Sequence, residues 1–293
     1  DSYRNFFLSF FGSPTEEGGT LANTNWQDFI FDEGVTQRYN ISVSGGTQET
    51  SFFVSGGYED TEGTAFNSNF QRLNLRSNLD HQINDRFRTS LNINLARSSQ
   101  FGVCQDGNFI SCPPSQAMFE APMSFPYLPN GEYNPQTRFG RSNNPAVSQN
   151  EVDRTNDVTQ IISSMNLVYR ANDWLTFNGL VGLDYRNTED NSFQSAIASP
   201  ATGGLVFFAN RNVRNFNTNL VANARQTFNG VHNVSGLVGT EYRRDFSQSR
   251  LVRGDGLPGP FFKVLSARAT PVTASGINSE WRLGSYFGNV KYN

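Results

Sequence analysis

Long apolar runs are missing from this 293-residue chain. Hydrophobic residues make up 37% of the sequence and the mean hydropathy is -0.50. No stretch approaches the ~18 consecutive apolar residues that a membrane-spanning helix requires. The sequence therefore excludes a helical membrane protein, and it does not concentrate its apolar residues in one thick core.

Lysine, histidine and cysteine are also scarce. The lysines are Lys263 and Lys291, and the chain has two histidines and two cysteines. A formal net charge of -3 without a basic run argues against nucleic-acid binding. No Gly-x-Ser-x-Gly or His-Glu-x-x-His motif is present. His81 and His232 lie beside predicted short turns, as interfacial residues do. We therefore expect no catalytic centre, no metal site and no cofactor.

Aromatic residues and glycine are abundant instead, with 26 Phe, 10 Tyr and 26 Gly. Such aromatic content indicates a folded chain. Apolar and polar residues alternate with a period of two, which predicts β-strands with one apolar face. The clear segments are 72–83, 87–95, 175–186, 215–225 and 234–243, and weaker ones are 38–45, 52–59, 159–170 and 281–292. We predict about nine antiparallel strands.

The predicted connections alternate strictly between short and long. Short ones lie at 46–48, 84–85, 171–173 and 229–231, and longer ones at about 60–68, 99–156, 188–211 and 248–279. Outer-membrane barrels show this alternation, with short periplasmic turns and long extracellular loops. Aromatic residues on the apolar phase end the strands on both sides, as interfacial girdles do: Tyr58, Tyr185 and Tyr242 on one side, Phe87, Tyr169 and Phe228 on the other. The pattern predicts an all-β transmembrane antiparallel barrel with a long extracellular loop at about 99–156.

Particular stretches resemble a known family. Residues 23–28 (NTNWQD), 39–46 (YNISVSGG), 52–58 (FFVSGGY) and 70–80 (FQRLNLRSNLD) are similar to the first barrel segments of SusC/RagA-type TonB-dependent outer-membrane receptors. Asn144-Pro145-Ala146 and residues 285–292 (SYFGNVKY) resemble landmarks of the same family. The strong similarity covers residues 23 to about 98, and the remainder agrees in strand rhythm more than in residues.

The resemblance implies an importer with a plugged barrel of about 22 strands. It implies energy supplied through TonB, a SusD-type surface lipoprotein as a lid, and oligosaccharides or peptides as cargo. Residues 1–293 would then form about nine strands of a single barrel domain, within a longer polypeptide that supplies the plug, the TonB-contacting segment and the closing strands. The pattern alone leaves two alternatives, a passive outer-membrane porin or surface-adhesion barrel, and a soluble β-sandwich.

Three groups of residues are candidates for function. Charged residues on the polar phase would face the lumen, where they contact the plug or passing cargo: Arg72, Arg76, Asp80, Arg88, Asp184, Arg186, Arg225, Glu241 and Arg243. Loop aromatics would contact cargo, grip the lid or pack the loop: Phe119, Phe125, Tyr127, Tyr133 and Phe139. Cys104 and Cys112 are predicted to form a disulfide in an oxidising compartment.

Overall fold

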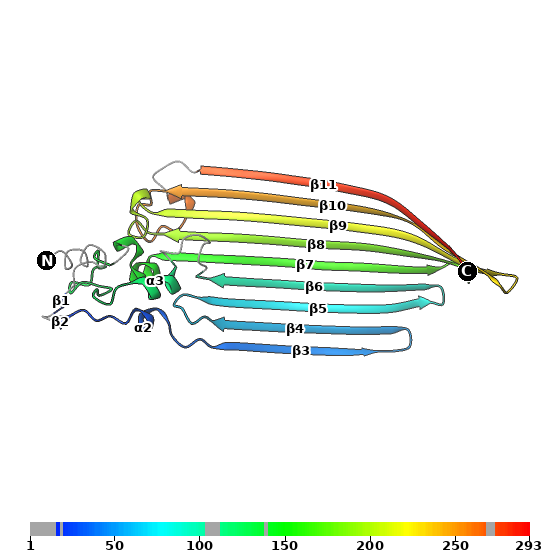
Figure 1. Ribbon diagram of the computed structural model, residues 1–293, viewed down its shortest axis with the longest axis horizontal. Helices are drawn as coiled ribbons and strands as arrows, with labels where there is room; N and C mark the ends of the chain where they lie inside the picture. Colours follow the sequence, from blue (N-terminus) through cyan, green and yellow to red (C-terminus); the bar gives the residue numbers. More distant parts are fainter. Residues whose placement is uncertain (1–15, 18–19, 103–111, 138–139, 268–272) are drawn as a thin grey trace.

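The computed structural model describes residues 16–17, 20–102, 112–137, 140–267 and 273–293. Nine antiparallel strands in one sheet dominate these residues, and they follow one another in chain order from β3 to β11 (Figure 1). A two-residue pair, β1 (Glu16–Glu17) and β2 (Thr20–Leu21), lies apart from the sheet. The sheet strands are β3 (Thr36–Gly46), β4 (Thr50–Glu62), β5 (Asn69–Asn84), β6 (Phe87–Phe101), β7 (Val152–Arg170), β8 (Leu175–Gln194), β9 (Leu205–Phe228), β10 (His232–Asp255) and β11 (Thr273–Tyr292).

Short and long connections lie at opposite ends of this sheet (Figure 1). We call them the turn end, with connections 47–49, 85–86, 171–174 and 229–231, and the loop end, with connections 63–68, 102–151, 195–204 and 256–272. At the turn end, Asn84 and Asn172 each accept two backbone N–H groups through their side-chain oxygens. These bonds hold the tight turns in place. The predicted alternation of short and long connections is therefore confirmed.

Strand pairing gives the sheet two chemically different faces. Residues directly opposite each other across a pair lie on the same face, so the register carries Leu95 through Ile161 to Tyr185, and Phe216 through Arg244 to Arg282. We call the face with Leu73, Tyr185 and Tyr242 the apolar face, and the face with Arg72, Asp184 and Arg243 the polar face. On β8, the apolar face from Leu175 to Tyr185 measures roughly 33 Å at about 3.3 Å per residue. At a tilt of about 40° this covers the ~25 Å apolar band of a barrel.

The strands run farther beyond Tyr185 and Tyr242 than the alternation indicates. The sequence predicts loops at 188–211 and 248–279, but β8 continues to Gln194, and β9 begins at Leu205. Likewise β10 continues to Asp255 and β11 begins at Thr273. Beyond the apolar band neither face of a strand contacts lipid, and some strand residues such as Phe193 and Val206 are buried by the loop end, so apolar residues no longer alternate with polar ones. The strands nevertheless continue there, because their backbones remain paired with the neighbouring strands.

The buried core lies at the loop end, mostly outside the sheet. The described residues form three short helices, α2 (Trp26–Ile30), α3 (Pro113–Phe119) and α4 (Pro145–Asn150), with 3-10 turns η2 (Arg141–Asn143), η3 (Pro200–Thr202) and η4 (Leu265–Ala267). Trp26, Ile30, Ala146 and Val147 are buried here, and the Trp26 indole N–H donates to the Ala121 carbonyl at 2.8 Å. No helix among the described residues has the length and apolarity to span a membrane.

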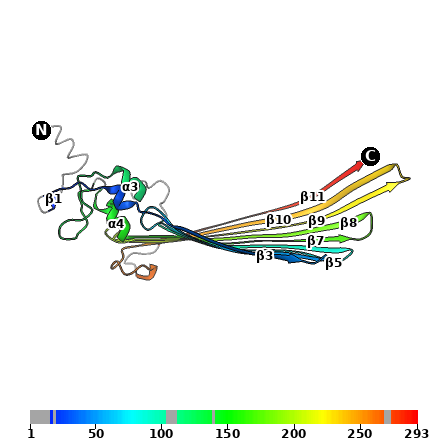
Figure 2. The same ribbon diagram turned by 90° about the horizontal axis from the view of Figure 1, so that it is seen from below.

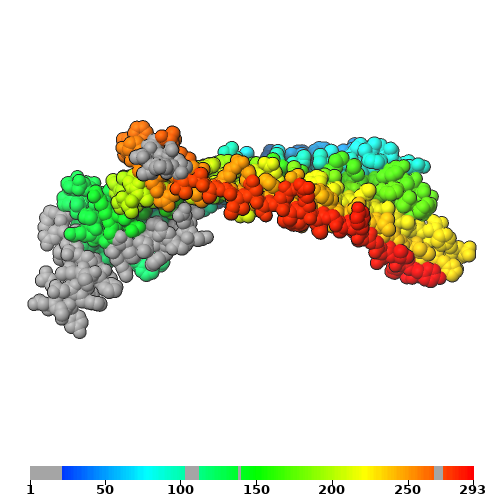
Figure 3. Space-filling model, turned by 90° about the horizontal axis from the view of Figure 1, so that it is seen from above, coloured from blue at the N-terminus to red at the C-terminus, as the bar shows by residue number. Residues whose placement is uncertain are grey.

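The helices and the β10–β11 connection lie on opposite faces of the sheet (Figures 2 and 3). Lys263 of that connection forms an ion pair with Asp153 and stands 5.0 Å over the Phe193 ring. Asp153 and Phe193 pair directly and share the phase of the apolar face. Because the helices occupy the other side, they cover the polar face at the loop end.

We call α2, α3, α4 and the described residues between α3 and α4 the helical cluster. Asn144 joins its parts. Its side chain is fully buried, accepts the Ala146 N–H at 2.9 Å as the N-cap of α4, and donates to the carbonyls of Pro126 and Asn134. We expect Asn144→Ala to lower the local stability of the 102–151 connection by about 2–3 kcal/mol, because a helix cap is lost and buried carbonyls lose their donor. Hydrogen exchange of the full-length protein measures this, with Ser142→Ala as the control. Unchanged protection in Asn144→Ala would contradict it.

Candidate functional site

All nine residues predicted to face the lumen lie on one face. The register carries the phase of Arg76 through Asn94 and Ile162 to Asp184, and from Asp184 through Asn215 to Asp245. The residues that share this phase, and so the polar face, are Arg72, Arg76, Asp80, Arg88, Asp184, Arg186, Arg225, Glu241 and Arg243. That this face lines a lumen stays a prediction.

Asp184, Glu241 and Arg243 gather around a shallow hollow that extends over β7 to β10. The hollow has a volume of about 370 Å³, and amide side chains from Asn215 and Asn217 line it as well. Gly182 also lines the hollow, and a Cβ there would meet the Asn217 side chain, which would have to move. The hollow therefore offers acidic, amide and guanidinium groups to a polar ligand or to a polar protein surface.

The charges around the hollow differ in how far they are satisfied. Arg243 Nε lies 2.9 Å from Asp245 Oδ2, and the guanidinium stands 4.9 Å from the centre of the Trp281 ring. One carboxylate oxygen of Asp184 is buried and has no hydrogen-bond partner among the described residues. A buried acceptor without a partner costs free energy. Asp184 is thus the group here with most to gain from a donor supplied by another molecule or domain.

The remaining charged residues are spread over the polar face. Arg72 lies opposite Glu59, and Asp80 accepts a hydrogen bond from Ser90. Arg88 and Arg225 lie near the turn end, opposite Val168 and Ser235. The structure thus brings together Asp184, Glu241 and Arg243 and leaves the others as separate charges on the same face.

The loop aromatics belong to the helical cluster. Tyr127 and Tyr133 pack together with ring centres 5.7 Å apart, and the Tyr133 hydroxyl donates to Glu151 at 2.9 Å. Phe119 is 37% exposed, and Phe125 is half-buried. Phe139 lies outside the described residues. For Tyr127 and Tyr133 these contacts favour loop packing among the three predicted roles.

Cys112 lies directly before α3 and is disulfide-bonded. Its predicted partner, Cys104, lies outside the described residues, so the pairing stays a prediction. The histidines each bond across a strand pair, His81 to Thr50 and His232 to Tyr292, both at 2.7 Å. Among the described residues, no group of three His, Cys, Asp or Glu is placed to hold a metal ion.

The sequence reasoning missed the buried amides of the 102–151 connection. Gln116, Asn134 and Asn144 are fully buried, and each donates to a backbone carbonyl. Amides in a loop rich in Pro, Asn and Gly resemble solvated residues. The one available signal was Asn144-Pro145, an N-cap followed by proline at the first helical position.

Comparisons with known proteins show which proteins this chain resembles. The chain is 29% identical over 92% of its length to TonB-dependent receptor P3 of Formosa agariphila, and 25% identical over its whole length to TonB-dependent receptor SusC of Bacteroides thetaiotaomicron. These matches cover 28% and 31% of the relatives. A solved structure of the RagAB peptide importer in its closed-closed state superposes with a TM-score of 0.71 at 21% identity, over 92% of this chain and 31% of that chain. No protein-family model matches.

The fold is that of a transmembrane β-barrel of the outer membrane, of which the nine antiparallel strands form one section. Within that class the similarity is to TonB-dependent receptors of the SusC/RagA type, as the residues of the first strands predict. The chain spans just under a third of the length of these relatives.

The lumen assignment can be tested with neighbouring residues that lie on opposite faces of β9. Asn217 is on the polar face and Thr218 on the apolar face. In the full-length protein in its native membrane, we expect a charged maleimide to label Asn217→Cys but not Thr218→Cys. Thr218→Cys should react once the protein is unfolded in denaturant, because the thiol can then ionise in water. The unmodified protein is the control for background labelling, and the reverse pattern would overturn the assignment.

Ionisation of Tyr133 should loosen the loop at high pH. Burial, the hydrogen bond to Glu151 and the negative charge of Glu151 raise the pKa of Tyr133 to about 12. Because the folded pKa lies above the unfolded value of about 10, the resulting stability is present below pH 10 and is lost as the pH rises through 12. We expect hydrogen-exchange protection of 127–133 to fall over this window in the full-length protein. The fall should be absent in Tyr133→Phe, and an equal fall in both proteins would rule this origin out.

Proposed function

We propose that this chain forms part of the barrel wall of a TonB-coupled outer-membrane importer of oligosaccharides or peptides. The observation that carries the proposal is the agreement of nearly the whole chain with receptors of this kind, in sequence with P3 and SusC and in fold with the RagAB importer. The passive porin or adhesion barrel has no comparable support. The activity belongs to the whole protein, of which this chain is a section.

The polar face supports a plugged barrel. A plug must be held by polar contacts, because the lumen of such a barrel is hydrated. Asp184, with its buried unpartnered oxygen, and Glu241 are acceptors for donors on a plug or on cargo. Asn215, Asn217 and Arg243 beside them add donors that suit sugar hydroxyls or peptide carbonyls equally well.

The helical cluster supports a controlled entrance. It covers the polar face at the loop end, so in a closed barrel it would lie over the mouth. Its interior is held by buried amides and the Trp26 hydrogen bond, which makes it an ordered wall and not a loose loop. A SusD-type lipoprotein is the partner proposed to close this mouth from outside, with Phe119 as an exposed aromatic contact.

Uptake measurements in the native organism separate active import from passive diffusion. We expect uptake of fluorescent oligosaccharides or peptides to fall at least tenfold on deletion of the gene, and equally on loss of TonB. The reason is that a plugged barrel opens only when energy is supplied. Loss of uptake with the gene but not with TonB would replace the importer by a porin. Co-purification of a SusD-type lipoprotein with the tagged full-length protein tests the lid, and its absence would remove that partner.

A further inference from the structure

Arginines on the apolar face are confined to one side of the apolar band. In the described strands they are Arg97, Arg214, Arg244, Arg250 and Arg282, and each lies between the band and the loop end. At the other side of the band this face carries His81 and His232, and no arginine or lysine in the described strands. The positive charge of the membrane-facing surface is therefore directed to the leaflet at the loop end.

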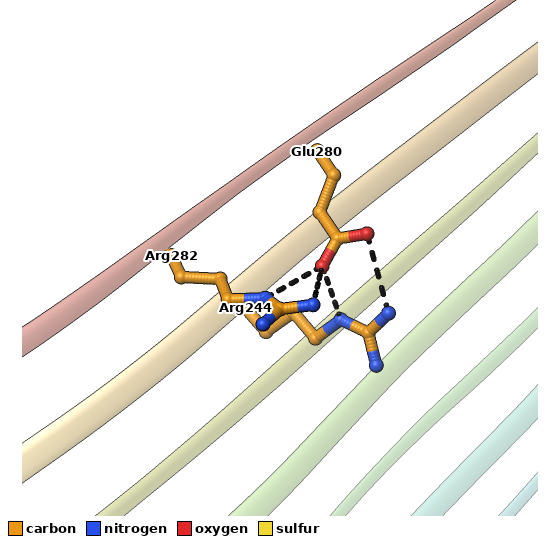
Figure 4. A network of polar contacts seen from close by, with 3 residues as sticks. All are labelled: Arg244, Glu280 and Arg282. Atoms are coloured by element: carbon orange, nitrogen blue, oxygen red, sulfur yellow. Dashed lines mark hydrogen bonds and ion pairs between the residues drawn. The ribbon is translucent and has the colours of Figure 1, made fainter.

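Three of these arginines are neighbours on β9, β10 and β11, and the Arg214 guanidinium donates to Asn212 Oδ1 at 2.8 Å and stands 5.7 Å from the centre of the Phe246 ring. Arg244 and Arg282 are directly opposite each other, and Arg214 is a diagonal neighbour of Arg244. Glu280 lies between the first two: its Oε1 accepts from Arg244 Nε at 2.8 Å and from Arg282 Nε at 2.7 Å (Figure 4). Like charges directly opposite each other in a sheet repel. One carboxylate offsets only part of the charge of three guanidinium groups.

The arginine cluster lies where a lipid headgroup would lie, with aromatic and then aliphatic residues on its membrane side. Tyr242 and Phe216 adjoin it on the membrane side and pack with ring centres 6.5 Å apart. From Tyr242 the apolar face continues through Val238 to Val234 along β10, where acyl chains would lie. The side chain of Arg244, on β10 between two paired strands, remains 47% exposed, so its outer N–H groups are accessible.

We propose that Arg214, Arg244 and Arg282 bind the phosphorylated headgroup of a lipid in the loop-side leaflet of the outer membrane. Guanidinium groups bind phosphate through paired hydrogen bonds, and basic clusters at a membrane surface select anionic lipids. Glu280 sets the two opposed arginines in position and partly neutralises them when no lipid is bound. The site is on the outside of the barrel, so it is independent of cargo and of TonB.

The test uses the full-length protein in detergent, titrated with diphosphorylated lipid A and followed by native mass spectrometry. We expect the Arg244→Gln/Arg282→Gln double variant to bind at least tenfold more weakly. Arg250→Gln is the matched control, since Arg250 lies on the same face of β10 but farther from the band, and it should change binding less than twofold. Equal weakening by the control and the double variant would show unspecific charge attraction and overturn the proposal.

A second variant distinguishes a lipid site from a structural ion network. Glu280→Gln removes the competing carboxylate, so it should bind the phosphorylated lipid several-fold more tightly. If the network only stabilises the strand pair, Glu280→Gln will lower thermal stability without tighter binding, and the proposal fails. Dephosphorylated lipid A and inorganic phosphate are the comparison ligands. Binding of inorganic phosphate as tight as that of lipid A would identify an anion site without a lipid, which also contradicts the proposal.

Discussion

Hydrogen bonding of the backbone in a medium without water is the constraint on which the rest of this structure depends. Lipid offers no partner to an exposed N–H or C=O group, so strands that cross a membrane must pair along their whole length. The seven inner strands, β4 to β10, meet this requirement by pairing with both of their neighbours in the chain, without a crossover, and β3 and β11 each pair on one side. Pairing of that kind fixes the register, and the register decides which side chains share a face. The position at which each strand begins therefore determines which side chains are available for function on each face.

Two environments then act on the same strands. On the apolar face, lipid selects residues such as Leu183 and Val238, with aromatic rings at the boundaries. On the polar face, charged residues such as Asp184 and Arg243 are tolerated because water or polar protein groups solvate their charges. The helical cluster adds a third environment at the loop end, where Gln116, Asn134 and Asn144 are buried and each donates to a backbone carbonyl. Only there does the chain form an interior of the kind found in soluble proteins.

These environments explain what sequence reasoning could predict and what it could not. Alternation is forced on the strands by two different media, so the strands, their faces and the order of short and long connections are readable from residues such as Leu73 and Arg72. The ends of β8, β9 and β10 are not, because above the membrane neither face contacts lipid and the alternation disappears. The partners within a face are not readable either. That Asp184 adjoins Glu241 and Arg243 depends on the register of three strands, which no local pattern contains.

The arginines of the apolar face illustrate the same limit and extend it. Arg244 lies on the apolar face of β10, two residues beyond Tyr242, but it is a charged residue. The register shows that Arg282 stands directly opposite it, with Glu280 between them. A repulsive pair kept at a membrane boundary is costly unless an anion is present for part of the time. One carboxylate serves two arginines incompletely, and the anion that a phospholipid or a phosphorylated lipid A brings to that depth is a phosphate. The electrostatic repulsion between Arg244 and Arg282 therefore supports the proposal that this part of the barrel wall binds a lipid of the surrounding membrane.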